Sequence, residues 1–429
     1  MSLKETTLRC LPKRPSRTHC SFGIDLLEHS SRGAVMTDPG FRHSEATDIV
    51  AAARRLAPQI VAARDEAERL RQTPPALAKA IADAGLYQMF LPRIVGGREL
   101  PPLVVFEAIE ELSKADGSVG WCAMIASDIS QLTGWLPTET VRAMCGDPPD
   151  LRAAGSLRPQ GRAWPADGGY RVKGQWNFAS GIHHANWLYC PCIIMDGEKA
   201  AMTPAGTPRV RAMWLPITQA KIIDTWSTIG MRGTGSQDFA VDDVFVSADH
   251  TCFLGEQPVE KGPLYLPRTL LTFLWTPTVA NALGIARGAI EAFIDMAERD
   301  ASTGSPALLR DRPHVQARIG EAEAILNAAR AYVIAAVGAA WEATCSNEAD
   351  PTRKIADARL AITHAMHEAT RSVEIVFRAA GTNAIHTRNP LERHFRDIQV
   401  AVQHNSAFPA HYESAGKVLM GLKPSDPGW

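Results

Sequence analysis

A dense run of turn residues between about residues 151 and 250 constrains the fold of this chain more than any other feature. Gly, Pro and Asp-Gly pairs recur there every few positions, and the segments between them are short and rich in β-forming residues, as at 187–190 and 239–246. Short strands at this spacing, with no helical pattern between them, are typical of an antiparallel sheet or a small barrel. We therefore expect a central β domain at residues 151–265.

The sequence on either side of this region has helical periodicity. Apolar residues recur every three or four positions from 46 to 71, opposite a charged face, until a double proline ends the pattern. Ala-rich segments after residue 266 are long enough to be bundle helices. The expected helices are at 46–71, 76–84, 103–114, 118–131, 277–300, 313–346, 354–380 and 406–421.

The chain is thus expected to be α+β and mostly α, with an N-terminal helical domain at 41–150, the β domain, and a C-terminal helical bundle at 266–429. Residues 1–40 show no sustained periodicity and are expected to form a flexible extension, in which Met36 is a candidate native start.

Composition argues against several classes of partner. The 429 residues include 45 Lys and Arg against 46 Asp and Glu, so there is no basic excess of the kind that nucleic acid or an acidic membrane surface attracts. No uninterrupted apolar run reaches the roughly 18 residues of a membrane span. Eight cysteines without a framework pattern favour a reducing, cytoplasmic location.

Common site signatures are absent from the sequence. It contains no dinucleotide-binding glycine motif after a strand, no phosphate-binding loop and no nucleophile elbow. His364 and His367 have a spacing that could share a metal, but no matching carboxylate accompanies them. We expect two helix-surface histidines there and no metal site. Cys190 and Cys192 are expected to be structural strand residues.

Several strings, taken together with the helical–β–helical order, resemble the acyl-CoA dehydrogenase superfamily over about residues 45–421. The resemblance implies that fold and a bound flavin, FMN or FAD. The strings are 230–236 (GMRGTGS) with 241–246 (VDDVFV), 377–381, 389–393 (NPLER) with Arg396-Asp397, and Arg299 with Gln316.

The resemblance also implies particular flavin contacts. Arg299 and Gln316 would reach the phosphate end of the cofactor, and the segment around Gly381 would complete the flavin site of a neighbouring subunit in a homotetramer. The expected contacts in the β domain are Ser156, Trp176, Phe178, Ser180 and Gly181. Aromatic faces, a hydroxyl and a close backbone approach suit a flat, amphipathic ring. A β-strand with core aromatics and an ordinary turn is the alternative for 176–181.

Two activities are compatible with this fold. A dehydrogenase of the superfamily needs a carboxylate base, often nine residues beyond the Arg of the Arg-Asp pair, and that position is Asn405 here. Glu291 or Glu298 keeps the dehydrogenase alternative open. The pattern at 403–406, in which His404 directly precedes Asn405, resembles instead that of the flavin-dependent two-component (group D) monooxygenases of the same fold. This family includes dibenzothiophene monooxygenase.

The monooxygenase resemblance implies that reduced flavin reacts with dioxygen to form a C4a-hydroperoxide, which hydroxylates a small organic substrate. Ser180 would hold the N5 proton, and His404 would exchange a proton near neutral pH. The expected substrate contacts lie on the helix at 118–131 and are Trp121, Met124, Ser127 and Asp128. A helix packed in the core with one solvent-facing turn is the alternative for Ser127 and Asp128. Electrons would come from a separate flavin reductase. The substrate stays open between aromatic or polyketide carbon, amine nitrogen and thioether sulfur. A scaffold protein without activity is a third possibility.

Overall fold

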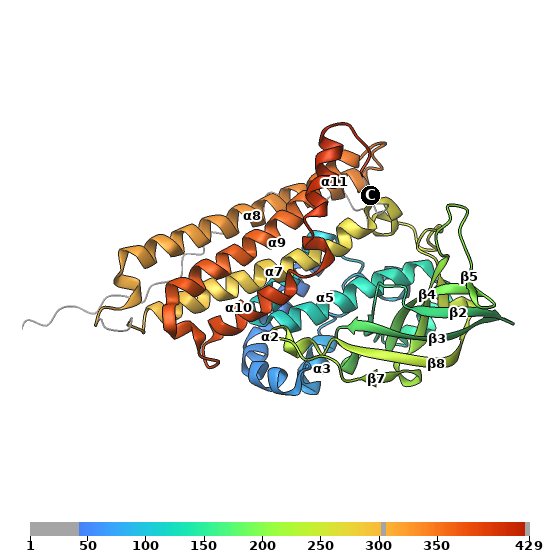
Figure 1. Cartoon of the computed structure of the whole chain (residues 1–429), viewed down its shortest axis with the longest axis horizontal. Helices are drawn as coiled ribbons and strands as arrows, with labels where there is room; N and C mark the ends of the chain where they lie inside the picture. Colours follow the sequence, from blue (N-terminus) through green and yellow to red (C-terminus); the bar gives the residue numbers. More distant parts are fainter. Residues whose placement is uncertain (1–42, 302–305, 425–429) are drawn as a thin grey trace, which may run out of the picture.

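The computed structural model describes residues 43–301 and 306–424. The expected extension at 1–40, with Met36, lies outside the described residues. The helices are α2 (His43–Leu70), α3 (Pro75–Asp83), α4 (Pro102–Ala115), α5 (Gly117–Gln131), α6 (Thr138–Cys145), α7 (Pro267–Ala297), α8 (Pro313–Cys345), α9 (Thr352–Ala380), α10 (Pro390–Ala401) and α11 (Ala410–Leu419). The expected helical–β–helical order is confirmed (Figure 1). The sequence did not predict α6 or α10.

The strands form one sheet, in the order β7-β8-β3-β2-β4-β6-β9. They are β1 (Ala153–Gly155), β2 (Gly161–Ala166), β3 (Gly169–Ala179), β4 (Trp187–Asp196), β5 (Lys199–Ala200), β6 (Val210–Pro216), β7 (Lys221–Ile223), β8 (Gln237–Ser247) and β9 (Thr251–Cys252). Most pairs are antiparallel, as expected, but β4 runs parallel to both β1 and β2. The sheet is mixed because the chain leaves the β2–β3 hairpin and crosses back to the other side of β2.

Long helices of the bundle lie side by side at the end of the molecule away from the sheet (Figure 1). Helices α7 and α8 are long and apolar enough to cross a membrane by length and composition, which the search for uninterrupted apolar runs did not predict. The apolar window of α7 is 94% buried within the protein, as in the core helix of a globular fold, whereas that of α8 is 44% buried.

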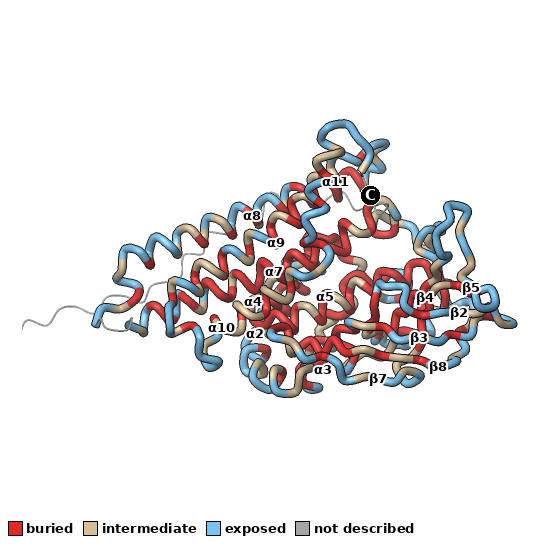
Figure 2. Tube along the Cα trace, viewed as in Figure 1, coloured by how far each residue is buried: buried red, intermediate tan, exposed pale blue. Residues whose placement is uncertain are grey.

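Helix α5 lies between the bundle and the sheet, where the buried segments of both meet (Figure 2). The side chain of Asp116 caps it by accepting the N–H of Val119 at 3.1 Å. The helix is buried along most of its length because it packs on α4, α7 and β1. This placement turns one face of α5 toward the space between sheet and bundle.

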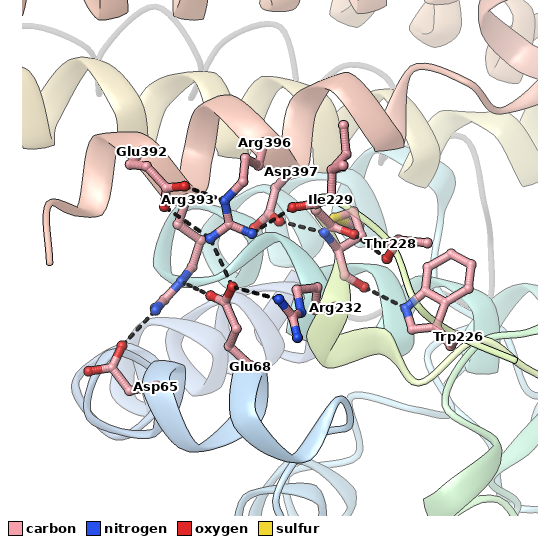
Figure 3. Close-up of polar contacts among 12 residues, drawn as sticks. Asp65, Glu68, Trp226, Thr228, Ile229, Arg232, Glu392, Arg393, Arg396 and Asp397 are labelled. Carbon is pink, nitrogen blue, oxygen red and sulfur yellow. Dashed lines mark hydrogen bonds and ion pairs between the residues drawn. The ribbon is translucent and has the colours of Figure 1, made fainter. Parts of the chain in front are cut away.

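A junction of polar contacts holds the β domain against α10 (Figure 3). We call it the turn junction: the loop at 228–232, with Glu68, Arg393, Arg396 and Asp397. Arg396 donates to the carbonyl of Ile229 at 2.7 Å, and the N–H of Met231 donates to Asp397 at 2.5 Å. Glu68 of α2 pairs with both arginines at 2.9 Å. The two strings that carried the family resemblance therefore meet in space.

Gly230 occupies the tightest point of the turn junction. A Cβ at this position would lie 2.2 Å from the backbone oxygen of Arg396, which is much closer than any side chain allows. The absence of a side chain thus lets the loop and α10 approach closely enough for their hydrogen bonds.

We predict that Gly230→Ala lowers the free energy of unfolding by about 1–3 kcal/mol, the usual cost of overpacking. Gly320→Ala is the matched control, because a Cβ there meets nothing within 4 Å on the exposed side of α8. That variant should be slightly more stable than the wild type. Denaturant unfolding measures the free energy of unfolding of both variants. Equal values for the two would show that the turn junction accommodates a Cβ at Gly230 without loss of stability.

Candidate functional site

A cavity of about 640 Å³ lies between the sheet and the bundle. Residues of α5, α7, the β domain and the segment at 400–408 line it, and its walls are mainly apolar and aromatic. The aromatic lining residues are Trp121, Phe178, Trp226, Trp275 and Phe408. A volume in the range of about 300–1,000 Å³ with a few polar groups is typical of a ligand site.

A chain of hydroxyl groups runs along one wall of the cavity. The indole N–H of Trp121 donates to Ser180 Oγ at 3.1 Å, and Ser180 Oγ lies 2.7 Å from Ser236 Oγ. Ser236 Oγ lies in turn 2.6 Å from Thr234 Oγ1, which contacts the carbonyl of Met231 at 2.9 Å. We call Ser180, Ser236 and Thr234 the hydroxyl ladder. It ends at the residue that the turn junction holds.

The direction of the ladder follows from its last member. A carbonyl can only accept, so Thr234 donates its one hydroxyl proton to Met231. Ser236 must then donate to Thr234, and Ser180 to Ser236. Ser180 is left with the lone pair that Trp121 does not use, and this oxygen can accept one further hydrogen bond from a molecule in the cavity.

His404 lines the same cavity, and its ring meets that of Trp121 edge to face at 5.6 Å between centroids. Its Nδ1 accepts the backbone N–H of Ser406 at 3.3 Å and lies 2.9 Å from Ser406 Oγ. In the neutral ring the proton is therefore on Nε2. Among the described residues no hydrogen-bond partner occupies Nε2, which makes it the nitrogen available to a ligand.

Burial lowers the pKa of His404 to about 4, and nearby His411 contributes in the same direction. The expectation that this histidine exchanges a proton near neutral pH is therefore corrected, because a ring desolvated in this way stays neutral at pH 7. The neutral ring offers the Nε2–H as a hydrogen-bond donor to the cavity. The structure thus brings Ser180 and His404 to one cavity, with Trp121 in contact with both.

Three further expected residues line the cavity: Ser156, Phe178 and Asp128. Ser156 Oγ accepts the backbone N–H of Arg158 at 3.2 Å, and the guanidinium of Arg158 lies 5.3 Å from the centre of the Phe178 ring. Phe178 has a φ of +63°, a conformation that bulky residues seldom adopt. Its ring remains half exposed at the cavity wall.

Two expected flavin contacts of the β domain, Trp176 and Gly181, do not line the cavity. Trp176 is fully buried in the sheet core, where its ring stacks on Phe239 and its N–H donates to the carbonyl of Pro191. In a regular strand Trp176, Phe178 and Ser180 would share one face. The pairing of β3 with β8 is irregular between Trp176 and Ala179, and Phe178 has a positive φ, so the residues after Trp176 turn toward the cavity instead. Gly181 serves the turn: its φ is +75° and its N–H donates to Thr234.

Met124 and Ser127 do not line the cavity either. Both are fully buried on the other side of α5, where Ser127 donates to the carbonyl of Leu86. The residues of α5 that do line the cavity follow helical spacing: Trp121, Ile125, Asp128 and Ile129. Leu132, directly after the helix, also lines it.

Arg299, Gln316 and Gly381 lie outside this cavity within one chain. Arg299 lines a second hollow of about 580 Å³, together with Asn383 and Arg388. Gln316 donates to the carbonyl of Arg310, and Gly381 ends α9 with a φ of +59°. The expected contacts of Arg299 and Gln316 with the phosphate end of the cofactor, and of the Gly381 segment with a neighbouring subunit's flavin, stay predictions.

The possible dehydrogenase bases are engaged elsewhere. Glu291 lies 3.7 Å from Lys114, and Glu298 lies 3.8 Å from Arg310. Neither lines the cavity described above, in which Asp128 is the one carboxyl group among the lining residues.

Sequence reasoning missed Ser236, Thr234 and Arg158 as site residues. Ser236 and Thr234 were noted only as letters of the 230–236 string. Their alignment depends on a sharp turn in which Met231 and Gly235 both have left-handed backbone conformations. The helical spacing from Trp121 on α5 was a signal that could have separated Asp128, at i+7, from Ser127, at i+6, whereas Met124, at i+3, fits the same pattern.

The residues present fit a flavin. A flat ring system needs apolar walls with a few hydrogen-bonding groups at its polar edge. The cavity supplies aromatic walls, the unused lone pair of Ser180, the Nε2–H of His404 and the exposed guanidinium of Arg158 at its margin.

Comparison with known proteins agrees with this geometry. Residues 43–135 match the family model of the acyl-CoA dehydrogenase N-terminal domain, and residues 277–408 match that of the C-terminal domain. Indole-3-acetate monooxygenase of Pseudomonas putida is 33% identical over 84% of this chain and 90% of that protein. The oxygenase component of FADH2-dependent resorcinol hydroxylase from a Rhizobium species is 28% identical over 84% and 90%.

Among solved structures, the 3-HSA hydroxylase from Rhodococcus sp. RHA1 matches with a TM-score of 0.81 and 25% identity, covering 89% of this chain and 99% of that one. The relatives share nearly their whole length with this chain. The chain therefore belongs to the flavin-dependent monooxygenases that are built on the acyl-CoA dehydrogenase fold.

Proposed function

We propose that this monooxygenase binds reduced FMN or FAD in the cavity between sheet and bundle and hydroxylates a small aromatic molecule there. The convergence of Ser180 and His404 on one aromatic-walled cavity carries the proposal. The named activities of the relatives, on indole-3-acetate and resorcinol, support an aromatic substrate. When bound, the reduced flavin supplies the electrons that activate dioxygen.

The chain's own residues have distinct parts in this proposal. Ser180 accepts a hydrogen bond from an N–H of the reduced ring and holds that proton, because its own proton is committed to Ser236. His404 donates from Nε2 to an oxygen atom in the cavity. The apolar rings of Trp121, Trp226 and Trp275 exclude water around the reacting atoms.

We infer two kinds of partner. The relative described as an oxygenase component supports a separate reductase that delivers the reduced flavin. A homotetramer is proposed because Arg299, Gln316 and Gly381 lie outside the cavity and because less than half of the apolar window of α8 is buried within one chain. Cysteines that are free thiols in the described residues support a reducing, cytoplasmic location.

The direct test mixes the full chain and chemically reduced FMN with oxygenated buffer and indole-3-acetate. Hydroxylated product, measured by mass spectrometry, should account for most of the flavin oxidised. His404→Ala should form at least about tenfold less product, the scale on which a positioned donor contributes to catalysis. Hydrogen peroxide as the only product, with wild type and variant alike, would contradict the proposal.

The hydroxyl ladder gives a second prediction. Thr234→Val removes the hydroxyl that orders Ser236 and Ser180, so the ratio of peroxide to product should rise about fivefold, equivalent to one hydrogen bond of ~1 kcal/mol. Thr234→Ser keeps the hydroxyl and should restore the wild-type ratio. Ser130→Ala is the control, because the buried Ser130 hydroxyl donates to its own helix at Ser127. Equal ratios of peroxide to product in Thr234→Ser and Thr234→Val would contradict the proposed role of the hydroxyl ladder.

The lowered pKa of His404 predicts the pH dependence. The neutral ring is the active form, and with a folded pKa of about 4 it stays neutral as pH falls from 7 through 6. Single-turnover hydroxylation should therefore show no loss with a midpoint near 6.5, the ordinary histidine value. A fall in the rate of hydroxylation near that pH, present in the wild type and absent in His404→Gln, would show that the ring is solvated and titrates normally.

A further inference from the structure

One wall of the cavity carries a carboxyl group whose buried oxygen has no hydrogen-bond partner in the described part of the chain. Asp128 lines the cavity from α5, and its Oδ1 is buried without a hydrogen-bond partner among the described residues. The lining residues beside it on the helix are Ile125 and Ile129. Burial alone raises the pKa of Asp128 well above the usual value for an aspartate, so no neighbouring cation offsets the desolvation.

An arrangement of this kind is costly when the cavity is empty. A buried polar atom without a partner loses its hydrogen bonds to water, and no bond within the protein offsets that free-energy cost. Asp128 forms no ion pair within the described residues and does not cap α5, whose N-terminal cap is Asp116. A partner for this carboxyl is therefore expected from a molecule in the cavity.

The position of Asp128 on α5 limits what that molecule is. Trp121 lies seven residues earlier on the same helix face, which corresponds to about 10 Å along the axis. Trp121 and His404 mark the oxygen-activating end of the cavity, and apolar side chains separate them from Asp128. A molecule that reaches both ends has an apolar body and a polar group at one side.

We propose that Asp128 accepts a hydrogen bond from a ring N–H or O–H of an aromatic substrate whose reacting carbon lies beside Trp121 and His404. This inference rests on the proposed function and names the residue of the same cavity that selects aromatics carrying a hydrogen-bond donor. A donor suits the site better than an acceptor, because a carboxyl offers an acceptor oxygen in both protonation states. A hydrogen bond from the ring to Asp128 also leaves more electron density on the carbon that is oxygenated.

The test compares two ligands of nearly equal shape, indole with its N–H and benzofuran with an ether oxygen in the same place. Isothermal titration calorimetry measures their binding to the full chain, so the result does not depend on turnover. The variants are Asp128→Asn, which keeps an acceptor oxygen, and Asp128→Leu, which keeps the approximate volume but has none.

We expect the wild type to bind indole roughly tenfold more tightly than benzofuran, as an unmade hydrogen bond at a buried partner implies. Asp128→Asn should keep most of this preference, and Asp128→Leu should abolish it by weakening indole alone. Equal binding of the two ligands to the wild type, or a preference that persists in Asp128→Leu, would overturn the proposal. So would binding of neither ligand at millimolar concentration.

The wild-type comparison decides the question even if Asp128→Leu does not fold. A failure of the proposed function looks different: indole binds with the Asp128-dependent preference, but reduced flavin and oxygen yield only hydrogen peroxide. The binding and product measurements therefore separate the two proposals.

Discussion

The arrangement of the site depends on the turn junction between the β domain and α10. Met231 donates its N–H to Asp397, and its carbonyl receives the hydroxyl of Thr234, so one residue connects the junction with the hydroxyl ladder. The same carbonyl accepts the indole N–H of Trp226, a wall of the cavity, at 3.0 Å. On the other side, α10 ends at Ala401, three residues before His404. The turn junction thus positions both the hydroxyl ladder that ends at Ser180 and the segment that carries His404.

The site combines a rigid polar edge with apolar walls. Ser180 owes its free lone pair to a sequence of donors that ends on a backbone carbonyl, and His404 owes its neutral state to burial. Neither property belongs to the side chain alone. Trp121 of α5 contacts both groups and fixes their relative position. Oxygen chemistry in a site of this kind needs few protein groups but needs them held in place and kept dry.

Periodicity and turn residues were sufficient to predict the order of helices and strands, because long amphipathic and Ala-rich segments are strong signals. The parallel placement of β4 beside β2 was not predictable, since it depends on a crossover between distant segments. Ser180, His404 and Asp128 were identified from the resemblance to the family and lie at the cavity. Trp176 and Met124 were misplaced, because a string of residues does not show which way each side chain faces after a bend or around a helix.

The most direct measurement of the central claim is a crystal structure of the full chain soaked with reduced FMN without oxygen. The account predicts the isoalloxazine ring in the cavity between sheet and bundle, with an N–H of the ring within hydrogen-bonding distance of Ser180 Oγ and His404 Nε2 facing the same edge. A flavin bound at another place, or a ring whose polar edge points away from both residues, would contradict it.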